Sequence, residues 1–338
     1  MRAMVSLPHR VARSSLSDLD LILGLDVGGT KLAAGVVDQT GRTLSLVRAA
    51  TPGPEVDSST AVDRLIELGE QALGEAGLHA ADLTAVGIAS GGPLDPERGV
   101  IVGPPNLPAW IDVPIVRRAE AAFGRPAILE NDANAGALAS HRWGPWAGTN
   151  DLVYLTISTG IGAGALIDGR LLRGSAGNGG EVGHMIVAFD GRKCECGQRG
   201  CVEAYVSGTA IARRAMEAIA AGRPSSLASL PAVTATDVAA AVGSDALATE
   251  IWRETTSILG AVVTSVINLF GPQLVILGGG VTRAGTMLVD PVARIAHASA
   301  LSPDGRAADV VITPHGDAIG VLGSAASALE RFGIGSVA

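Results

Sequence analysis

LILGLDVGGTKLAAGVVDQTGRTL, residues 21–44, and LVYLTISTGIGAGALIDGRLL, residues 152–172, follow one plan in two distant parts of a 338-residue chain. Each stretch begins with an apolar strand, turns at glycine and threonine, and continues in a second strand toward an Asp-x-x-Gly or Asp-Gly turn. Each therefore predicts an antiparallel β-meander, and the repetition predicts two halves that start alike.

The segments that follow each meander predict further strands and helices. Strand patterns lie at 85–90 and 126–131 in the first half and at 273–279 and 308–314 in the second. Apolar residues recur at helical spacing over 59–77 and 248–270. Strand-rich starts followed by βα units, occurring twice, predict the α/β class with two similar domains, and the cleft between them is the expected ligand site.

The first glycine turn has the composition of an anion site. Gly28 and Gly29 lack Cβ atoms, so backbone N–H groups can approach a phosphate closely, while Thr30 adds a hydroxyl and Lys31 a cation. We expect a positive φ at Gly29. Asp26, at the end of the preceding strand, could hold Mg²⁺ through water.

Two other glycine turns share this character. Ser158-Thr159-Gly160 opens the second half, and Gly278–Gly280 follows a buried strand pattern, which predicts Gly279 and Gly280 near the nucleotide. Taken singly, such a turn is usually an ordinary hairpin or strand-to-helix connection. Two matched turns can clasp the phosphates of one nucleotide, and the lack of GxxxxGK[ST] excludes a P-loop NTPase.

AILENDANAGALASHRW, from residue 127, contains the candidate catalytic base. A strand pattern runs into Asn131-Asp132 and a helix pattern follows, so Asp132 stands where α/β folds bind ligands. A carboxylate there can take a proton from a hydroxyl nucleophile while Asn131 orients neighbouring hydroxyls. The alternative is that Asp132 only caps the helix, and the two roles can coexist.

HMIVAFDGRKCECGQRGCVE, residues 184–203, contains all three cysteines of the chain. His184, Cys194, Cys196 and Cys201 supply the four N and S ligands of a closed, structural Zn²⁺ site. Ordinary buried cysteines and a disulfide are the alternatives. The polar, glycine-rich surroundings argue against the first, and the odd cysteine number argues against the second.

Composition and charge exclude several classes of protein. A net charge of −8 and a pI near 5.3 argue against nucleic-acid binding. The uncharged run over 255–282 contains a Gly-Pro break, so it predicts a helix and a short buried strand and not a membrane span. Residues 1–20 lack the pattern of a signal peptide and are expected to be a flexible extension. We therefore expect a cytoplasmic protein.

Five motifs in order resemble the ROK family of sugar kinases, repressors and open reading frames, within the actin/hexokinase/Hsp70 superfamily. They are LDVGGTK, ENDANAGAL, STGIGAG, GGEVGH followed by CECGQRGCVE, and GDAIGVLGSA, and the resemblance spans about residues 21–332. Among family members the chain most resembles ATP-dependent bacterial glucokinases. The resemblance implies two actin-like (ribonuclease H-like) domains and phosphoryl transfer from ATP to the 6-hydroxyl of a hexose, giving glucose 6-phosphate from glucose as in glycolysis.

The resemblance also implies roles for individual residues. The catalytic residue of the family falls on Asp132, and Mg²⁺ is expected near Asp26. The histidine of the zinc site is expected to contact the sugar as well. The substrate contacts fall on Asn106, Asn131, Asp132, Glu181, His184 and Glu203, and the phosphate contacts on Asp26, Gly28, Gly29, Thr30, Thr159 and Gly160. The composition of the glycine turns adds Lys31, Gly279 and Gly280 to the expected ATP contacts.

The implied domain organisation places residues 21–139 and a C-terminal helix, about 318–333, in the first domain. Residues 140–317 form the second domain, which contains the zinc segment 184–203. A homodimer or homotetramer is expected. Asn178-Gly179 departs from the pair of alanines that many members have before the GExGH segment, which leaves the pocket wall and the exact sugar open.

Several alternatives remain open from the sequence. The sugar could be N-acetylmannosamine, allose, mannose or fructose, and polyphosphate could replace ATP. A sugar-responsive repressor would carry a DNA-binding helix-turn-helix before the first phosphate turn. Only about 24 residues precede that turn here, and the chain is acidic, so a kinase is the preferred interpretation. A non-catalytic protein that binds zinc and sugar is disfavoured by Asp132 and the phosphate turns.

Overall fold

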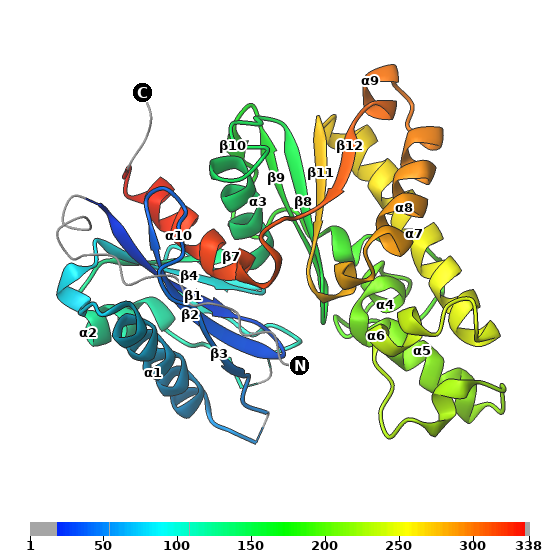
Figure 1. The fold of residues 1–338 in the computed structure, drawn as a ribbon, viewed down its shortest axis with the longest axis horizontal. Helices are drawn as coiled ribbons and strands as arrows, with labels where there is room; N and C mark the ends of the chain where they lie inside the picture. Colours follow the sequence, from blue (N-terminus) through cyan, green and yellow to red (C-terminus); the bar gives the residue numbers. More distant parts are fainter. Residues whose placement is uncertain (1–18, 54, 108, 335–338) are drawn as a thin grey trace, which may run out of the picture.

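The computed structural model describes residues 19–53, 55–107 and 109–334. The predicted extension 1–20 therefore lies almost wholly outside the described residues. Two five-stranded sheets, with strand orders β3-β2-β1-β4-β7 and β10-β9-β8-β11-β12, form the two halves of the molecule. Each sheet consists of an antiparallel meander followed by two parallel strands, so the α/β prediction and the predicted repeat are confirmed (Figure 1).

The elements follow the sequence patterns closely. The strands are β1 (Leu21–Val27), β2 (Lys31–Asp38), β3 (Val47–Ala50), β4 (Ala85–Ser90), β5 (Leu94–Asp95), β6 (Val100–Ile101), β7 (Ala127–Asn131), β8 (Leu152–Ile157), β9 (Ile161–Ile167), β10 (Arg170–Leu171), β11 (Leu274–Gly278) and β12 (Asp309–Ile312). The α-helices are α1 (Ser58–Ala76), α2 (Ile115–Phe123), α3 (Asp132–Arg142), α4 (Glu203–Val206), α5 (Gly208–Ala220), α6 (Ala235–Ala240), α7 (Ala246–Phe270), α8 (Thr286–Ser299), α9 (Pro303–Arg306) and α10 (Ile319–Arg331).

Local chemistry explains the main boundaries. α1 begins after Asp57, whose side chain accepts the N–H of Thr60, and ends at Gly77 in the left-handed conformation. α7 begins after the capping residue Asp245 and ends at Gly271. The apolar run 255–282 is thus a helix, a break and the buried strand β11, as predicted. Among the helices of the described residues, none combines the length and the apolar character that a bilayer crossing requires.

Two helices, α3 and α10, lie between the sheets (Figure 1). α10 packs on β1 and β4 of the first sheet, α3 packs on β8 and β9 of the second, and the two helices contact each other. The close approach of α10 requires Gly24 and Gly87, where a Cβ would clash with backbone carbonyls of that helix. The predicted boundary between residues 139 and 140 falls inside α3.

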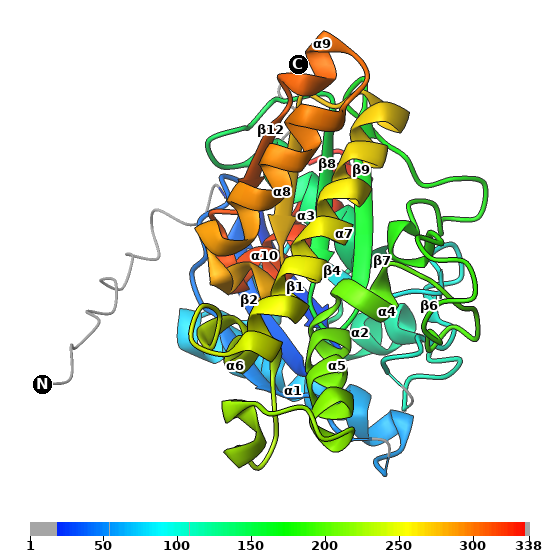
Figure 2. The same ribbon diagram turned by 90° about the vertical axis from the view of Figure 1, so that its right-hand side faces the viewer.

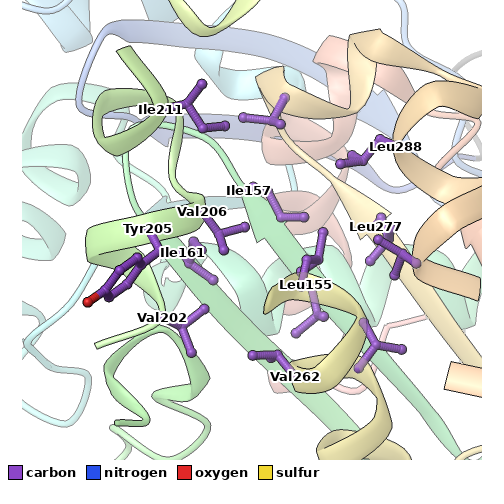
Figure 3. Packing of buried hydrophobic residues seen from close by; sticks show 14 of the residues in the cluster. Leu155, Ile157, Ile161, Val202, Tyr205, Val206, Ile211, Val262, Leu277 and Leu288 are labelled. Atoms are coloured by element: carbon purple, nitrogen blue, oxygen red, sulfur yellow. The ribbon is translucent and has the colours of Figure 1, made fainter. Parts of the chain in front are cut away.

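The outer faces of the sheets are covered by separate helices. α1 and α2 cover the first sheet, and α4 to α8 cover the second, as the turned view shows (Figure 2). In the second half, Val202, Tyr205 and Val206 pack beside Ile161 of β9 and Leu155 of β8 (Figure 3). This packing fixes α4, the short helix that begins at Glu203.

Candidate functional site

A cleft of about 540 Å³ lies between the two halves, within the size range of small-molecule sites. Both glycine turns and the ends of β1, β7, β8 and β11 contribute to its walls. The sequence-predicted residues that line it are Asp26, Gly28, Gly29, Thr30, Lys31, Asn106, Asn131, Asp132, Thr159, Gly160, Glu181, His184, Glu203, Gly279 and Gly280. The fold therefore brings every predicted substrate and nucleotide contact to one cavity.

Asp132 is the first residue of α3, and Asn131 is the residue that caps this helix. Asn131 Oδ1 accepts the N–H groups of Ala133, at 2.9 Å, and Asn134, at 3.2 Å. The residue that caps α3 is thus Asn131 and not Asp132, since the cap precedes the first helical residue. The Asp132 side chain is left at the cleft, where its Oδ1 accepts the N–H of Ala133 at 2.8 Å.

Two acidic side chains that the first half contributes to the cleft have raised pKa values. Burial raises the pKa of Asp132, against the opposing effect of the Ala133 N–H bond. Burial also raises the pKa of Asp26 to about 7, the charge of Asp132 adds to this shift, and Lys31 and Arg48 oppose it. A cation beside Asp26 would relieve this cost, because a positive charge favours the ionised carboxylate.

Gly320, in the first turn of α10, is a site residue that sequence reasoning did not identify. A Cβ at this position would clash with the carboxylate of Asp26. Glycine therefore lets the helix approach Asp26 without displacing its carboxylate. GDAIGVLGSA was part of the family resemblance, yet its spacing alone gives no sign that Gly320 meets a residue far back in the chain.

A second group of polar side chains surrounds the turn Ser158–Gly160. Glu203 Oε2 accepts the N–H of Ile161 at 2.9 Å, and the Glu203 side chain is buried. A Cβ on Gly160 would lie 2.5 Å from Glu203 Oε2 and 2.9 Å from Asn106 Nδ2. Because Gly160 has no side chain, the Glu203 carboxylate of the second half and the Asn106 amide of the first half can both approach this turn.

The four predicted zinc ligands are adjacent, with their ligand atoms all within 4.8 Å of one another. Cys196 Sγ lies 3.8 Å from Cys201 Sγ, and Cys194 Sγ lies 3.8 Å from His184 Nδ1. Tetrahedral Zn²⁺ with bonds of about 2.3 Å to sulfur requires sulfur atoms about 3.8 Å apart. Since the cysteines are not bonded to one another, the donor set fits a zinc ion, and the disulfide alternative is wrong.

His184 lies on both the metal cluster and the cleft. Its Nδ1 is the atom near Cys194, whereas its Nε2 lies 3.9 Å from Glu181 Oε2. Residues 182–184 form a single 3₁₀ turn, so Glu181 and His184, three positions apart, face the same way. Burial raises the pKa of Glu181, with His184 opposing the shift and Asp132 and Glu203 adding to it.

Two cationic side chains and one carboxylate form a network at the edge of the cleft. Lys31 Nζ lies 3.2 Å from Asp317 Oδ1, and Arg283 binds both oxygens of Asp317 at 2.9 and 3.0 Å. Despite partial burial, which acts in the opposite direction, Lys31 and Arg283 lower the pKa of Asp317. Asp317 and Arg283 line the cleft but were not predicted from the sequence.

The backbone at Gly29 corrects one expectation. Gly29 is not among the residues with positive φ, so that prediction was wrong. A side chain is instead disfavoured by crowding, because a Cβ would lie 3.2 Å from the carbonyl oxygen of Asn106. The turn therefore packs closely against the loop that carries Asn106.

Proteins of known family resemble this chain in sequence and in structure. The ROK family model matches residues 22–331. The chain belongs to the ROK family. Its five motifs, recognised in the sequence, are thus family motifs, and the predicted pair of similar actin-like halves is confirmed.

Relatives within the ROK family include enzymes and regulators. The chain is 32% identical over 326 residues to a glucokinase of Streptomyces coelicolor, covering 92% of this chain and 98% of that protein. A structure of a ROK family glucokinase from Streptomyces griseus in complex with glucose and AMPPNP has a TM-score of 0.78 and 34% identity, covering 91% of this chain and 98% of that one. A xylose repressor of Caldicellulosiruptor bescii is 29% identical over 283 residues, covering 82% and 70% of the two chains.

Proposed function

We propose that this protein is an ATP-dependent hexose kinase that phosphorylates the 6-hydroxyl of glucose. The observation that carries the proposal is Asp132, an acidic group left open to a cleft in which both matched glycine turns meet. Similarity to glucokinases over nearly the whole chain supports the same reaction.

The sugar is proposed to bind where the two halves supply complementary polar groups. Asn106 and Asn131 come from the first half, whereas Glu181, His184 and Glu203 come from the second. Carboxylates accept from sugar hydroxyls, and amides both donate and accept, so this set can satisfy several hydroxyls at once. A hydroxyl without its partner in such a site can cost a wrong sugar roughly 10⁴-fold in specificity.

The proposed reaction moves one proton and one phosphoryl group. The hydroxyl oxygen forms a bond to the γ-phosphorus of ATP, and the bond from that phosphorus to the bridging oxygen breaks, with its electron pair leaving on ADP. Asp132 accepts the hydroxyl proton, and its raised pKa suits this task because a base works best when its pKa is near the operating pH.

The nucleotide is proposed to lie against the two glycine turns. Gly28, Gly29, Thr30, Thr159 and Gly160 offer backbone N–H groups and hydroxyls, and Gly279 and Gly280 lie on the same cleft. Asp26 would hold Mg²⁺, which neutralises charge on the transferring phosphoryl group when bound.

Zinc is proposed to have a structural role. With His184, Cys194, Cys196 and Cys201 as ligands, no coordination position is left for substrate. The ion would instead hold His184 and the chain leading to Glu203 in place beside the sugar. A cytoplasmic location and a homodimeric or homotetrameric state stay predictions from the sequence.

The test must distinguish the proposed glucokinase from a kinase for another sugar, from a polyphosphate-dependent kinase and from a sugar-responsive regulator. We would measure ADP release by the wild-type protein with ATP and a panel of glucose, mannose, allose, fructose and N-acetylmannosamine, and identify the phosphorylated position by NMR. Glucose is expected to give the highest kcat/KM, with phosphate on the 6-oxygen. Faster turnover of another sugar would reject glucose as the substrate.

Two further measurements test polyphosphate as the phosphoryl donor and a regulator that binds sugar without phosphorylating it. Polyphosphate in place of ATP is expected to support little turnover. No phosphorylation of any sugar, together with binding of a sugar by calorimetry, would reject the kinase in favour of a sugar-responsive regulator.

A further inference from the structure

One short segment of the second half forms hydrogen bonds to three residues of the first half, Glu130, Glu330 and Leu94, beside the cleft. We call residues 173–178, between β10 and the 3₁₀ turn 182–184, the strap. Its first residue, Arg173, donates to Glu130 Oε2 at 2.9 Å and to Glu330 Oε2 at 2.6 Å. Glu130 is buried at the end of β7, immediately before Asn131.

The last residue of the strap makes a two-point contact with a backbone. Asn178 Oδ1 accepts the N–H of Leu94 at 3.0 Å, and Asn178 Nδ2 donates to the carbonyl of Leu94 at 3.0 Å. Leu94 belongs to β5 and is buried in the core of the first half. Because a backbone unit offers one donor and one acceptor, the Asn178 amide, which carries one group of each kind, satisfies both in a single orientation.

The loop is shaped to deliver Asn178. The N–H of Gly179 donates to the carbonyl of Arg173 at 2.9 Å, which closes the strap on itself. A Cβ on Gly179 would lie 3.0 Å from that same carbonyl oxygen, and one on Gly177 would lie 3.0 Å from Pro96 Cγ. The strap thus touches the hairpin that contains Leu94 at two places.

Asn178 also lies beside the proposed sugar contacts. A Cβ built on Gly92 would lie 3.6 Å from Asn178 Oδ1, 3.6 Å from Glu181 Oε1 and 3.7 Å from Asn131 Nδ2. Three polar atoms, two from the second half and one from the first, therefore surround one glycine of the cleft wall. The Leu94 contact fixes the distance between the halves at this point.

We propose that Asn178 is a positioning residue for the sugar: it fastens the strap to Leu94 and thereby sets the spacing of Glu181 against Asn131 and Gly92. The proposal rests on the proposed function, because its effect is on a sugar site. The nucleotide turns lie on other elements, so the strap should influence sugar binding and leave ATP binding unchanged.

The test compares Asn178→Ala and the nearly isosteric Asn178→Asp with wild type. Asn178→Ala removes both bonds to Leu94, and we expect KM for glucose to rise about tenfold, with kcat within about threefold and KM for ATP within about twofold. Asn178→Asp keeps the shape but places a carboxylate against the Leu94 carbonyl and near Glu181, so its loss should be at least as large. Arg98→Ala is the matched control: this exposed residue of the same β5–β6 hairpin forms only a weak pair with Asp95, at 3.5 Å, and its removal should change neither KM.

A second measurement does not depend on catalysis. The Leu94 amide hydrogen should exchange about tenfold faster in Asn178→Ala than in wild type, with no ligand present. Wild-type glucose KM in either Asn178 variant would overturn the proposal, as would an equal rise in the KM values of glucose and ATP or unchanged exchange at Leu94. Failure of the proposed function is distinct, since the wild-type protein itself would then phosphorylate no sugar.

Discussion

The first and second sheets share one strand order, yet they carry different kinds of functional group. The first half supplies Asp26 and Asp132, two carboxylates with pKa values raised by burial that lie beside the nucleotide turn and at the start of α3. The second half supplies a buried, hydrogen-bonded acceptor, Glu203, and the cluster of zinc ligands next to it. A repeated fold therefore does not imply repeated chemistry: changes in the first half should act on the chemical step and changes in the second on the position of the sugar.

The largest expected effect tests the chemical role of the first half. Asp132→Asn should lower kcat by about 10² to 10⁴ while glucose affinity stays within about tenfold, because the amide cannot accept the hydroxyl proton. Helix α3 should persist, since Asn131 provides its cap. Steady-state kinetics, calorimetric binding of glucose and circular dichroism measure these quantities. A variant with near-native kcat would show that Asp132 is not the base.

The next effect tests the positioning role of the second half. Cys196→Ser should release the zinc ion and weaken glucose binding by about 10² or more, while ATP binding stays within about threefold. Local disorder of residues 177–205 is expected, because the rest of the half has its own core. Metal analysis and separate titrations of glucose and nucleotide check this, with the exposed neighbour Gln198→Ser as control. Normal phosphorylation by a zinc-free variant would contradict it.

The third effect concerns Asp26 of the first half, whose raised pKa should make the stability of the protein depend on pH. The folded-state pKa of Asp26, about 7, lies above its ordinary value of 3.8, so the folded protein binds more protons and loses stability as pH rises from about 4 to 7. Asp26→Asn should therefore raise the free energy of unfolding at pH 8 by about 1 to 3 kcal/mol, and the gain should vanish near pH 4. Urea unfolding across this range, without nucleotide or Mg²⁺, tests the effect. Glu70→Gln, an exposed change on α1, should change the free energy by less than about 0.5 kcal/mol, and an equal gain there would refute the assignment.

The smallest expected effect lies at the edge between the halves. Asp317 binds Lys31 of the first half and Arg283 of the second, and all three side chains are substantially exposed. Asp317→Asn should free both cations for phosphate and lower KM for ATP by about two- to threefold at low salt, with KM for glucose unchanged. Kinetics at two ionic strengths provide the measurement. A large loss of ATP binding would instead make Asp317 a nucleotide ligand.

Most of the cleft was predictable because its chemistry is concentrated in short motifs. Gly28-Gly29-Thr30, Asn131-Asp132 and the cysteine cluster each combine residue types that a strand-to-turn junction or a metal requires. Asp317, Arg283 and Gly320 escaped prediction because each acts through a partner distant in the chain, respectively Lys31, Asp317 and Asp26.

The sequence by itself determined the two meanders, the order of their strands and the composition of the zinc cluster, since periodicity, turn residues and ligand types are local properties. Only the tertiary structure decided which residue caps α3, how α3 and α10 divide between the sheets, and that Asn178 fastens to Leu94. These outcomes depend on the distance between elements remote in the chain. That distance is set by packing, through small residues such as Gly24 and Gly87, which no local pattern encodes.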